Sequence, residues 1–180
     1  KRHVCLNSTC SGIRSNKQTI ILTDLAAYTM YLSGFPEIFT VLQIGDECGG
    51  VSPHCGTAHN DAAYWFGYDG IYRYSGRVER MECDVHTYVY GNLTTTQLMK
   101  TTCGLNTLYN EVWWFYCSAN SLEIDSVVVY QIDENIFWTG SIARTAFVNR
   151  GEFASKPIGA DADGYLHLHE TGADNGSVAL

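Results

Sequence analysis

The hydrophobic and polar positions of this chain fall into short β-rich runs that turn residues separate. β-Branched and aromatic residues dominate the runs, and Gly, Asn, Asp and Ser occupy the segments between them, as is typical of strands joined by turns. In Trp113–Tyr116 and Ser126–Tyr130, apolar side chains would point to both faces, which indicates sheets covered on both sides. We therefore predict an all-β fold of stacked antiparallel sheets.

The same pattern predicts one short helix among many strands. Residues Thr94–Thr102 include Gln97, Leu98, Met99 and Lys100, which are good helix formers. The predicted strands are 18–23, 26–32, 37–42, 62–67, 71–75, 87–90, 111–117, 124–132, 136–139, 143–148 and 165–169.

A weak internal repeat accompanies these strands. Ala26–Tyr28 aligns with Ala62–Tyr64, Asp61–Phe66 aligns with Asn110–Phe115, and Asp163–Leu166 continues the series. Each unit opens on an Asp or Asn turn and continues into a hydrophobic strand, and its length of about 40–50 residues matches a β-propeller blade. The blade-like units are expected to start near residues 24, 61, 110 and 163.

Two all-β architectures fit this repeat. The favoured interpretation is a set of propeller-like blades, in which Trp138 at the end of the clearest unit would pack between neighbouring blades. The alternative is a plain antiparallel sandwich whose hairpins resemble each other by chance. Because about four blades fit into residues 1–180, we expect a single domain that forms an arc, or a fragment, of a larger propeller.

Composition and charge narrow the classes of function. Hydrophobic residues make up 46% of the chain and aromatic residues 13%, so the chain can bury a core. Its 11 Lys and Arg against 19 Asp and Glu give a net charge of −8, without the basic cluster that gripping nucleic acid requires. An acidic surface would instead repel the phosphates of DNA, which suits a channel through which DNA passes.

The sequence also bears on targeting and completeness. No apolar run is long enough for a transmembrane helix, and no signal peptide is visible. The chain begins with Lys1 rather than Met and ends without a closing element, so we expect it to be part of a longer protein.

Seven cysteines are scattered along the chain. Their odd number and irregular spacing argue against a closed disulfide framework, so most of them are expected to be small buried hydrophobes in a reducing cytoplasm. They are Cys5, Cys10, Cys48, Cys55, Cys83, Cys103 and Cys117.

Two sets of residues could hold a metal. The first is Cys48, His54, Cys55 and His59, whose histidine spacing suits zinc but whose cysteine spacing does not, so a chance cluster on a loop is favoured. The second is His167 and His169, which would share one face of a strand. A solvated face of a terminal strand is the preferred interpretation there, and neither set is assigned a metal or a cofactor.

Catalytic motifs are missing from the sequence. It contains no Gly-x-Ser-x-Gly elbow, no phosphate-binding loop with Lys, and no Ser-x-Asp-x-Gly-x-x-Trp box of the sialidase type. Carboxylates are numerous but lie in turn-like contexts, where Asp and Asn close turns, so a glycosidase is the weakest of the hypotheses. We expect no enzyme. The carboxylates are Asp46, Glu47, Glu79, Glu82, Asp84, Asp133, Glu134, Asp161 and Asp163.

The aromatic residues admit two interpretations. They could form a platform for sugars, but their positions inside strands favour packing in the core and between blades. The residues concerned are Tyr64, Trp65, Tyr72, Tyr74, Trp113, Trp114, Tyr116 and Trp138.

Four segments of the chain resemble a known family. They read AYWFGYDGIYRYSGRVERMECDV (63–85), YVYGNLTTTQ (88–97), NEVWWFYCSANSLEIDSVVVYQIDENIFWTGSIARTAFVNRG (110–151) and DGYLHLHETGAD (163–174). In these segments the chain is similar to the tail hub or nozzle proteins of short-tailed bacteriophages, the packaged-DNA stabilisation type. Residues 110–151 carry the most specific part of the resemblance, and residues 1–43 match less well.

The resemblance implies a structural virion protein without catalytic residues. It would be assembled in the host cytoplasm into a homo-oligomeric ring, six-fold in that family, below the portal and its adaptor. The ring would continue the DNA channel, help to retain and deliver the genome without sequence-specific binding, and attach tail fibres or a needle. The rival hypothesis is a carbohydrate-binding propeller that recognises the host surface.

Overall fold

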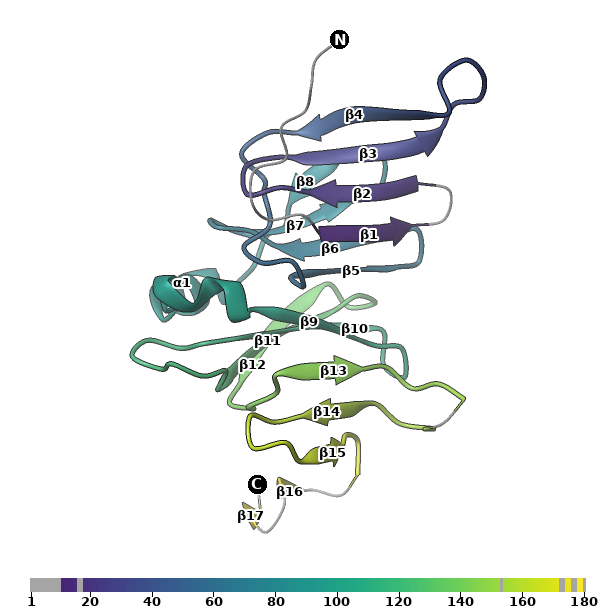
Figure 1. Cartoon of the computed structure of the whole chain (residues 1–180). Coiled ribbons are helices and arrows are strands. Elements are labelled where there is room, and N and C mark those ends of the chain that lie inside the picture. The colour runs from purple at the N-terminus through teal and green to yellow at the C-terminus, as the bar shows by residue number, and fades with distance from the viewer. Residues whose placement is uncertain (1–10, 16–17, 153, 172–173, 176–177, 180) are drawn as a thin grey trace.

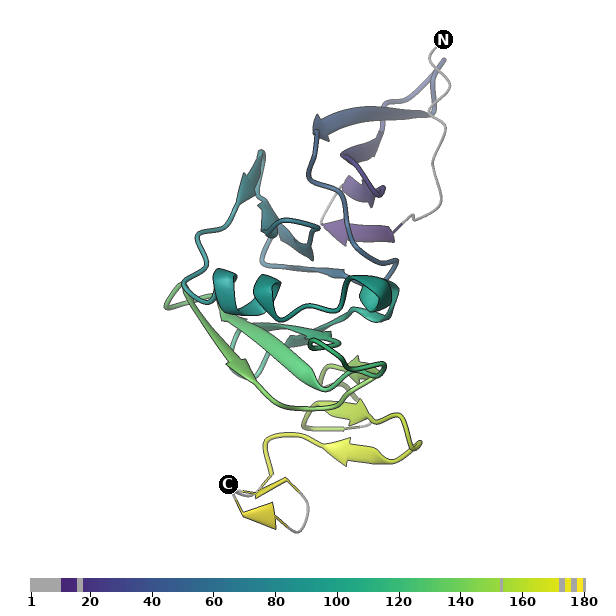
Figure 2. The ribbon, with the colours of Figure 1, turned by 90° about the vertical axis from the view of Figure 1, so that its left-hand side faces the viewer.

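The computed structural model describes residues 11–15, 18–152, 154–171, 174–175 and 178–179 and consists mostly of β-structure. Four antiparallel sheets follow one another along the chain, and in each sheet the strands pair in the order in which they occur in the sequence (Figure 1). Turned by 90°, the molecule shows the same succession from the N-terminal sheet to the C-terminal one (Figure 2). The all-β prediction is therefore confirmed.

The first two sheets and the two short helices occupy the N-terminal part of the chain. Sheet 1 contains β1 (Ser11–Ser15), β2 (Gln18–Leu22), β3 (Ala27–Leu32) and β4 (Phe39–Gly45). Sheet 2 contains β5 (Gly56–His59), β6 (Ala62–Phe66), β7 (Ile71–Tyr74) and β8 (Val78–Arg80), and it is followed by α1 (His86–Gly91) and the 3-10 helix η1 (Thr95–Lys100).

The remaining strands form two further sheets and a short ladder. Sheet 3 contains β9 (Thr102–Asn106), β10 (Glu111–Tyr116), β11 (Ser126–Gln131) and β12 (Ile136–Gly140). Sheet 4 has three strands, β13 (Ala146–Val148), β14 (Ile158–Ala160) and β15 (Leu166–Leu168), and β16 (Asp174–Asn175) pairs with β17 (Val178–Ala179).

The sheets meet through their first strands. β1 contacts β5, β5 contacts β9, and β9 contacts β13. The approach is close because glycines occupy it: a Cβ on Gly56 would lie 2.4 Å from Cδ1 of Ile13, and one on Gly104 would lie 2.3 Å from Cδ1 of Phe147. Only residues without side chains permit backbones and neighbouring side chains to come this near.

Aromatic side chains fill the space between sheets 2 and 3. The side chains of β6 are all buried, as are those of β10 apart from Glu111. Tyr64 lies against Tyr130, with ring centroids 5.8 Å apart, and Phe66 lies against Tyr116 at 6.3 Å. Such ring pairs contribute stability beyond the area they bury.

Two buried tryptophans anchor these sheets to the chain that precedes them. The indole Nε1 of Trp65 donates a hydrogen bond of 2.7 Å to the Cys48 carbonyl, and that of Trp114 donates one of 3.0 Å to the Cys55 carbonyl. Each bond satisfies a polar group that burial would otherwise leave unpaired, and each fixes how one sheet sits on its neighbour.

Most predicted strands are present within a few residues of their expected bounds, but one is wrong. Residues 87–90 form α1 instead of a strand, because the helical turn stacks His86 on Tyr90, with ring centroids 4.6 Å apart, and buries Val89 completely. Tertiary packing thus overrides the strand-like alternation of these residues. The predicted helix 94–102 exists as η1, a 3-10 helix rather than an α-helix.

The internal repeat has a partial structural counterpart. The Asp61 and Asn110 motifs both precede the second strand of a sheet, and both asparagine-rich turns use the left-handed conformation, at Asn60, Asp61 and Asn110. The Asp24 motif, however, precedes the third strand of sheet 1, and Asp163 precedes the third strand of sheet 4. The unit starts near 24, 61, 110 and 163 therefore lie inside the sheets, because each sheet begins one or two strands earlier than the repeat indicates.

The remaining expectations from composition concern membranes and cysteines. Within the described residues, no helix has the length and apolar character that crossing a membrane requires. Cys48, Cys55 and Cys117 are buried free thiols, as expected, whereas Cys83 and Cys103 are half-buried free thiols. Cys5 and Cys10 lie outside the described residues.

We predict that Gly104→Ala loosens the junction between sheets 3 and 4. The new methyl group would meet the Phe147 ring, and overpacking of this kind costs about 1–3 kcal/mol of unfolding free energy. Urea denaturation at an unchanged m-value measures the loss. Gly12→Ala is the matched control, since a Cβ there has nothing within 4 Å; equal stability of the two variants would contradict the close approach.

Candidate functional site

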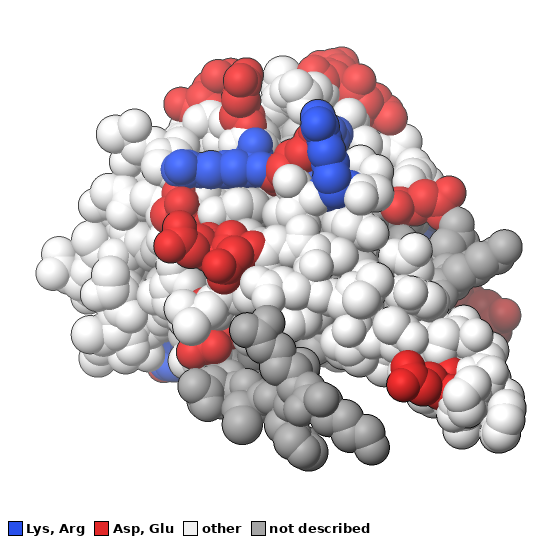
Figure 3. All heavy atoms as spheres, turned by 90° about the horizontal axis from the view of Figure 1, so that it is seen from above, with Lys and Arg blue, Asp and Glu red and all other residues white. Residues whose placement is uncertain are grey.

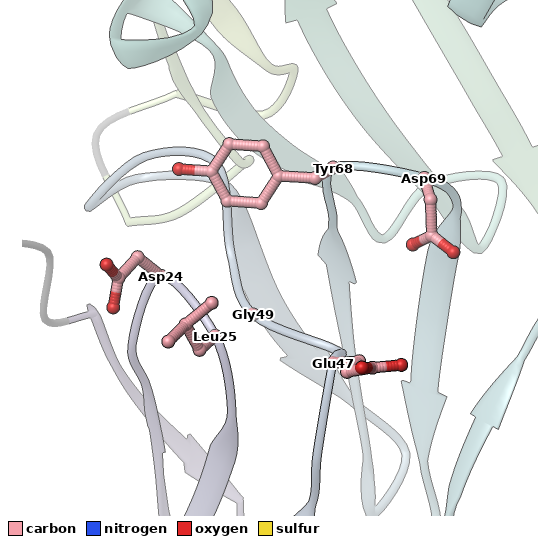
Figure 4. A pocket seen from close by; sticks show the side chains of 6 residues that line it. All are labelled: Asp24, Leu25, Glu47, Gly49, Tyr68 and Asp69. Atoms are coloured by element: carbon pink, nitrogen blue, oxygen red, sulfur yellow. The ribbon is translucent and has the colours of Figure 1, made fainter.

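A pocket opens between sheets 1 and 2, at the edge where three connections meet. These are the β2–β3 turn (23–26), the β4–β5 loop (46–55) and the β6–β7 turn (67–70). The pocket has a volume of about 400 Å³ (Figure 4). It is lined by Asp24, Leu25, Glu47, Gly49, Tyr68 and Asp69.

Backbone hydrogen bonds hold the β2–β3 turn against the β4–β5 loop. Thr23 Oγ1 accepts from the backbone N–H of Ala26 at 2.9 Å and shapes the turn, a role typical of threonine. The N–H of Cys48 donates to the Leu25 carbonyl at 3.0 Å, and the N–H of Gly50 donates to the Thr23 carbonyl at 2.9 Å. The floor of the pocket is therefore fixed in place.

Glycine is required at position 49, where the β4–β5 loop lies directly against the β2–β3 turn. A Cβ on Gly49 would lie 2.3 Å from the backbone carbonyl of Asp24, which no side chain can tolerate. Two residues earlier, Glu47 adopts the left-handed conformation with φ of 54° and turns the chain out of β4.

The opposite side of the pocket is fixed by a network around Asp69. The Tyr72 hydroxyl donates to Asp69 Oδ1 at 2.6 Å, and Arg80 Nη1 lies 3.6 Å from Asp69 Oδ2. Burial, reinforced by the hydrogen bond to Asp69, raises the pKa of Tyr72 well above its ordinary value. Tyr72 thus remains a neutral donor that holds the carboxylate in position.

The chemistry of the pocket combines an aromatic wall with carboxylates. Tyr68 and Leu25 supply apolar surface, and Asp24, Glu47 and Asp69 come from three different connections, as Figure 4 shows. Hydroxyl groups and cations are the ligand groups that carboxylates bind, and an aromatic ring adds a face for a sugar or a cation. Burial, with Asp24 nearby, raises the pKa of Tyr68, so its hydroxyl is a donor at neutral pH.

The cysteine and histidine set at residues 48–59 is dispersed. Cys48 and Cys55 are buried, and burial raises the pKa of both thiols, whereas His54 is exposed. His59 lies with Nε2 3.3 Å from Oδ1 of Asn110 in the next sheet. In the parts of the chain that the structure describes, no group of three or more His, Cys, Asp or Glu residues is arranged to hold a metal ion.

His167 and His169 lie at the junction with sheet 3 rather than on a fully solvated face, which corrects the prediction. His167 Nε2 lies 2.7 Å from Asp161 Oδ2. His169 Nε2 accepts a hydrogen bond of 3.0 Å from Nε of Arg144, and its ring stands edge-on to Trp113 and Phe147. Alternation along the strand correctly predicts that both histidines lie on the same side of sheet 4. It does not reveal that sheet 3 packs against that side.

Arg144 is buried, and it donates both to His169 and, through Nη1, to the Ala143 carbonyl at 2.7 Å. Burial, together with the positive charges of Arg144 and His167, lowers the pKa of His169 to about 4. Neutral His169 is therefore the acceptor that this buried guanidinium requires.

Two of the carboxylates named in the sequence have clear structural roles, Asp161 in a turn and Glu79 in ion pairs. Asp161 Oδ1 accepts from the backbone N–H groups of Asp163 and Tyr165 at 3.0 and 2.9 Å, as a turn-closing Asp does. Glu79 lies on β8 instead of in a turn and forms ion pairs with Arg73 and Arg77, which together lower its pKa.

The proposed aromatic platform is mostly core. The buried members are Tyr64, Trp65, Tyr72, Trp113, Trp114 and Tyr116, so the preference for packing over sugar binding is confirmed for them. Trp138 is 37% exposed on the outermost strand of sheet 3 and packs edge-on against Trp113. Tyr68 lies just after β6 and faces the pocket between sheets 1 and 2. No motif in the sequence marks it as a residue of a binding site.

Sheet 4 presents an apolar outer face. In sheet 4, the cross-strand register places Ala146, Ala160 and Leu166 in one row and Val148, Ile158 and Leu168 in the next, all on the side away from sheet 3.

The corresponding surface of sheet 1 lies at the other end of the molecule. Ile20, Leu22 and Ala27 point toward sheet 2 and are buried. The alternate positions lie on the other side of the sheet. Thr19 and Gln43 are among them, and Arg14 lies opposite Thr19 in β1; the apolar members are Ile21, Tyr28, Met30, Leu32, Phe39 and Val41.

Comparison with known proteins adds no relative. Neither the family models nor the curated proteins that were searched match this chain.

We predict that stability falls as the pH drops from about 6.5 to about 4, through His169. The folded pKa is about 4 and the unfolded value about 6.5, so within this window the unfolded state binds the proton and folding loses free energy. Since part of the ring reaches solvent, we expect a loss of up to about 2 kcal/mol.

The His169→Gln variant isolates this effect, because glutamine retains an acceptor for Arg144 and does not titrate. The difference in unfolding free energy between the wild type and His169→Gln should shrink toward acid pH. His54→Gln, at an exposed position, is the control and should leave the pH profile unchanged. A wild-type profile that His169→Gln does not alter would contradict the assignment.

Proposed function

We propose that this chain is a structural subunit of a phage tail, in the hub or nozzle ring below the portal of a short-tailed virion. The observation that carries the proposal is the succession of sheets, which join through their first strands and expose large apolar side chains on sheets 1 and 4, such as Leu32, Phe39 and Leu166. Exposed apolar surface of this kind is suited to an assembly rather than to a free monomer.

The sheets are proposed to be propeller-like blades. In a β-propeller, four-stranded sheets repeat radially around a channel, with consecutive strands side by side in each sheet. The meander order and the contacts of β1 with β5, β5 with β9 and β9 with β13 support this arrangement. A two-sheet sandwich is less suitable, since sheets 2 and 3 each pack on two neighbours instead of one.

The charge of the chain supports a passage that does not retain DNA. The net charge is −8, and Arg73, Arg77, Arg80 and Lys100 lie in ion pairs with carboxylates. Seen from above, the surface has several groups of acidic side chains with a few basic ones among them (Figure 3). Such a surface repels phosphates, so a genome would pass along it without sequence-specific binding.

The resemblance of residues 110–151 supplies the rest of the proposal. The ring would contain six copies, would be assembled in the host cytoplasm, and would contact the portal or its adaptor on one side and tail fibres or a needle on the other. It would retain the packaged genome before ejection, and its role would be structural, without a catalytic step.

The proposal predicts a fixed position in the particle. Antibodies against the chain, imaged by negative-stain electron microscopy on purified virions, should bind between the capsid and the tail tip. The matched control is an antibody against the major capsid protein, which should decorate the shell. Finding the chain only as a free monomer outside particles would overturn the proposal.

A second candidate, recognition of a host-surface carbohydrate, is favoured by the pocket beside Tyr68. Carboxylates from three connections and one half-exposed aromatic ring are the groups that bind sugar hydroxyls and sugar faces.

This candidate predicts glycan binding that depends on Tyr68. On a glycan array, Tyr68→Ala should reduce binding at least about tenfold, as the loss of a stacked ring of roughly 1.5 kcal/mol implies. Tyr165→Ala is the control, because Tyr165 is similarly exposed and lies far along the chain in sheet 4. An array without binding by the wild type would remove the candidate.

A further inference from the structure

We propose that Glu111, Asn106 and Glu170 form a pH-sensitive latch between sheets 3 and 4, whose hold weakens as the pH rises from acid toward neutral. Asn106 ends β9 and Glu111 begins β10, both in sheet 3, whereas Glu170 follows β15 of sheet 4. We call these three residues the carboxylate latch. It goes beyond the proposed role in a virion and does not depend on it.

Asn106 is completely buried, and its side-chain amide group joins the two carboxylates. Its Nδ2 donates to Oε2 of Glu111 and to Oε1 of Glu170, at 3.1 Å in both cases. An amide group has two hydrogens, so each carboxylate can receive one of them. Asn106 Oδ1 accepts from the backbone N–H of Leu108 at 3.1 Å, so the nitrogen is the atom that faces the carboxylates. One buried donor thus spans the two sheets.

Glu111 is held in place within sheet 3. It is half-buried and lies opposite Asn106 in the register of β9 and β10. Its Oε2 also accepts from the indole Nε1 of Trp113 at 2.9 Å. Two donors therefore converge on one carboxylate oxygen, and the side chain cannot swing away from the seam without leaving both unpaired.

Glu170 reaches back to sheet 3 from the end of sheet 4. Its backbone adopts the left-handed conformation, with φ of 60°, and its carbonyl accepts from Lys156 Nζ. The preceding residue, His169, donates its backbone N–H to the Pro157 carbonyl at 2.9 Å. The carboxylate of Glu170 is therefore attached to a turn that sheet 4 itself holds, so its bond to Asn106 links sheet 4 to sheet 3.

The negative charges of the two carboxylates oppose this arrangement. Oxygens that lie 3.1 Å from the same nitrogen are close neighbours, and like charges at such range favour a proton on one of the groups. Burial is the largest influence on the pKa of Glu111 and raises it, and the charge of Glu170 also raises it, whereas the hydrogen bonds from Trp113 and Asn106 lower it; the net change is upward. A proton on Glu111 removes the repulsion and leaves Asn106 able to donate to both groups.

The direction of the pH dependence follows from the raised pKa. The ordinary glutamate value is about 4.5, so from there upward the unfolded state releases the proton before the folded state does. The stability that the protonated Glu111 provides is therefore complete below about pH 4.5 and is lost as the pH rises through the folded pKa.

The other charged groups near the pair bond elsewhere. Lys156 donates to the carbonyl of Glu170 rather than to its carboxylate, Arg150 Nε donates to Thr107 Oγ1 at 3.2 Å, and Arg144 donates to the neutral His169 ring. On β11, the residue opposite Glu111 is the uncharged Gln131. Among the described residues, neither Glu111 nor Glu170 forms an ion pair with a cation.

His169, next to Glu170, titrates in the opposite sense. Its neutral form accepts from Arg144, so the seam loses stability toward acid through His169. Glu111 loses stability toward neutral pH. The two effects oppose each other over overlapping pH ranges, so the latch has to be measured with the histidine removed.

Two variants separate the members of the pair. Glu170→Gln removes one charge and retains an oxygen that can accept from Asn106, and Glu111→Gln stands for the protonated group. Glu134→Gln is the control, because Glu134 is exposed in the turn between β11 and β12. Circular dichroism checks that all variants are folded.

The first measurement follows the proton. A ¹³C NMR titration of the side-chain carboxyl carbons should give Glu111 a pKa above the ordinary glutamate value in the wild type. In Glu170→Gln this pKa should move to a lower value, because the neighbouring charge is gone. Glu134→Gln should leave it unchanged.

The second measurement follows the seam by hydrogen exchange in the His169→Gln background. Two backbone amides report the docking of sheet 4: that of residue 169, bonded to the Pro157 carbonyl, and that of Thr107, which donates to Asn149 Oδ1 at 3.1 Å. From about pH 4.5 to about pH 7, their protection, corrected for intrinsic exchange, should fall roughly twofold to fivefold, the range for interactions between exposed charges. Adding Glu111→Gln should abolish this fall.

Three results would overturn the latch. An unchanged Glu111 pKa in Glu170→Gln would show that the two charges are not coupled. Coupled titration without a change in exchange at residue 169 and Thr107 would show that the pair does not hold the seam. An equal change at the Phe66 amide of sheet 2 would indicate a loss of global stability instead of a local release. Each result is independent of whether the chain is found in a virion tail.

Discussion

The close approach of the first strands is the constraint on which the other features of this structure depend. Gly56 and Gly104 lie where β5 meets β1 and where β9 meets sheet 4, at distances that exclude even a methyl group. Because the sheets converge there, the space between them widens toward the later strands. Large aromatic side chains on β6 and β10 fill that wider space, so small residues at the first strands and large ones farther out are two parts of one packing solution.

Several of the polar groups that this packing buries are paired, whereas Arg73 Nε and Thr101 Oγ1 are buried without a hydrogen-bond partner among the described residues. Trp65 and Trp114 donate their indole N–H groups to carbonyls that precede or begin sheet 2, and Arg144 donates to the neutral ring of His169. The Trp114 bond joins sheet 3 to the residue before β5, across a seam otherwise held by apolar contact, which is not directional, so it restricts how sheet 3 can rotate on sheet 2. The Arg144–His169 bond instead lies within the sheet 4 region.

The sequence predicts the aromatic and β-branched strands well, because periodicity and turn residues report burial directly. Among the strands of the four sheets, it does not predict β1, β5, β8, β9 and β14, whose sequences SGIRS, GTAH, VER, TCGLN and IGA each contain a single β-branched residue and, apart from β8, a glycine. Their strand conformation follows from the neighbours they pair with. The strand predicted at 87–90 is wrong for a related reason: α1 is selected by the packing of Val89 and Tyr90, not by local preference.

The candidate sites, like the strands, could be predicted from the sequence only in part. The burial of most of the aromatic residues follows from their positions inside the predicted strands. The Tyr68 pocket could not be found in the sequence, because its walls come from three connections that only the stacking of sheets 1 and 2 brings together. The exposed apolar positions of sheets 1 and 4 also depend on register, and register becomes visible only when the pairing of β3 with β4 and of β14 with β15 is known.

The serial order of the sheets has a consequence for how the chain is made. Every sheet is a meander of consecutive strands, and every seam joins sheets that are neighbours in the sequence. A chain that emerges from the ribosome can therefore complete one sheet and dock it on the previous one before the next is synthesised, without waiting for a distant segment. Vectorial synthesis would therefore dock sheets 2, 3 and 4 in that order, each on a sheet that is already complete.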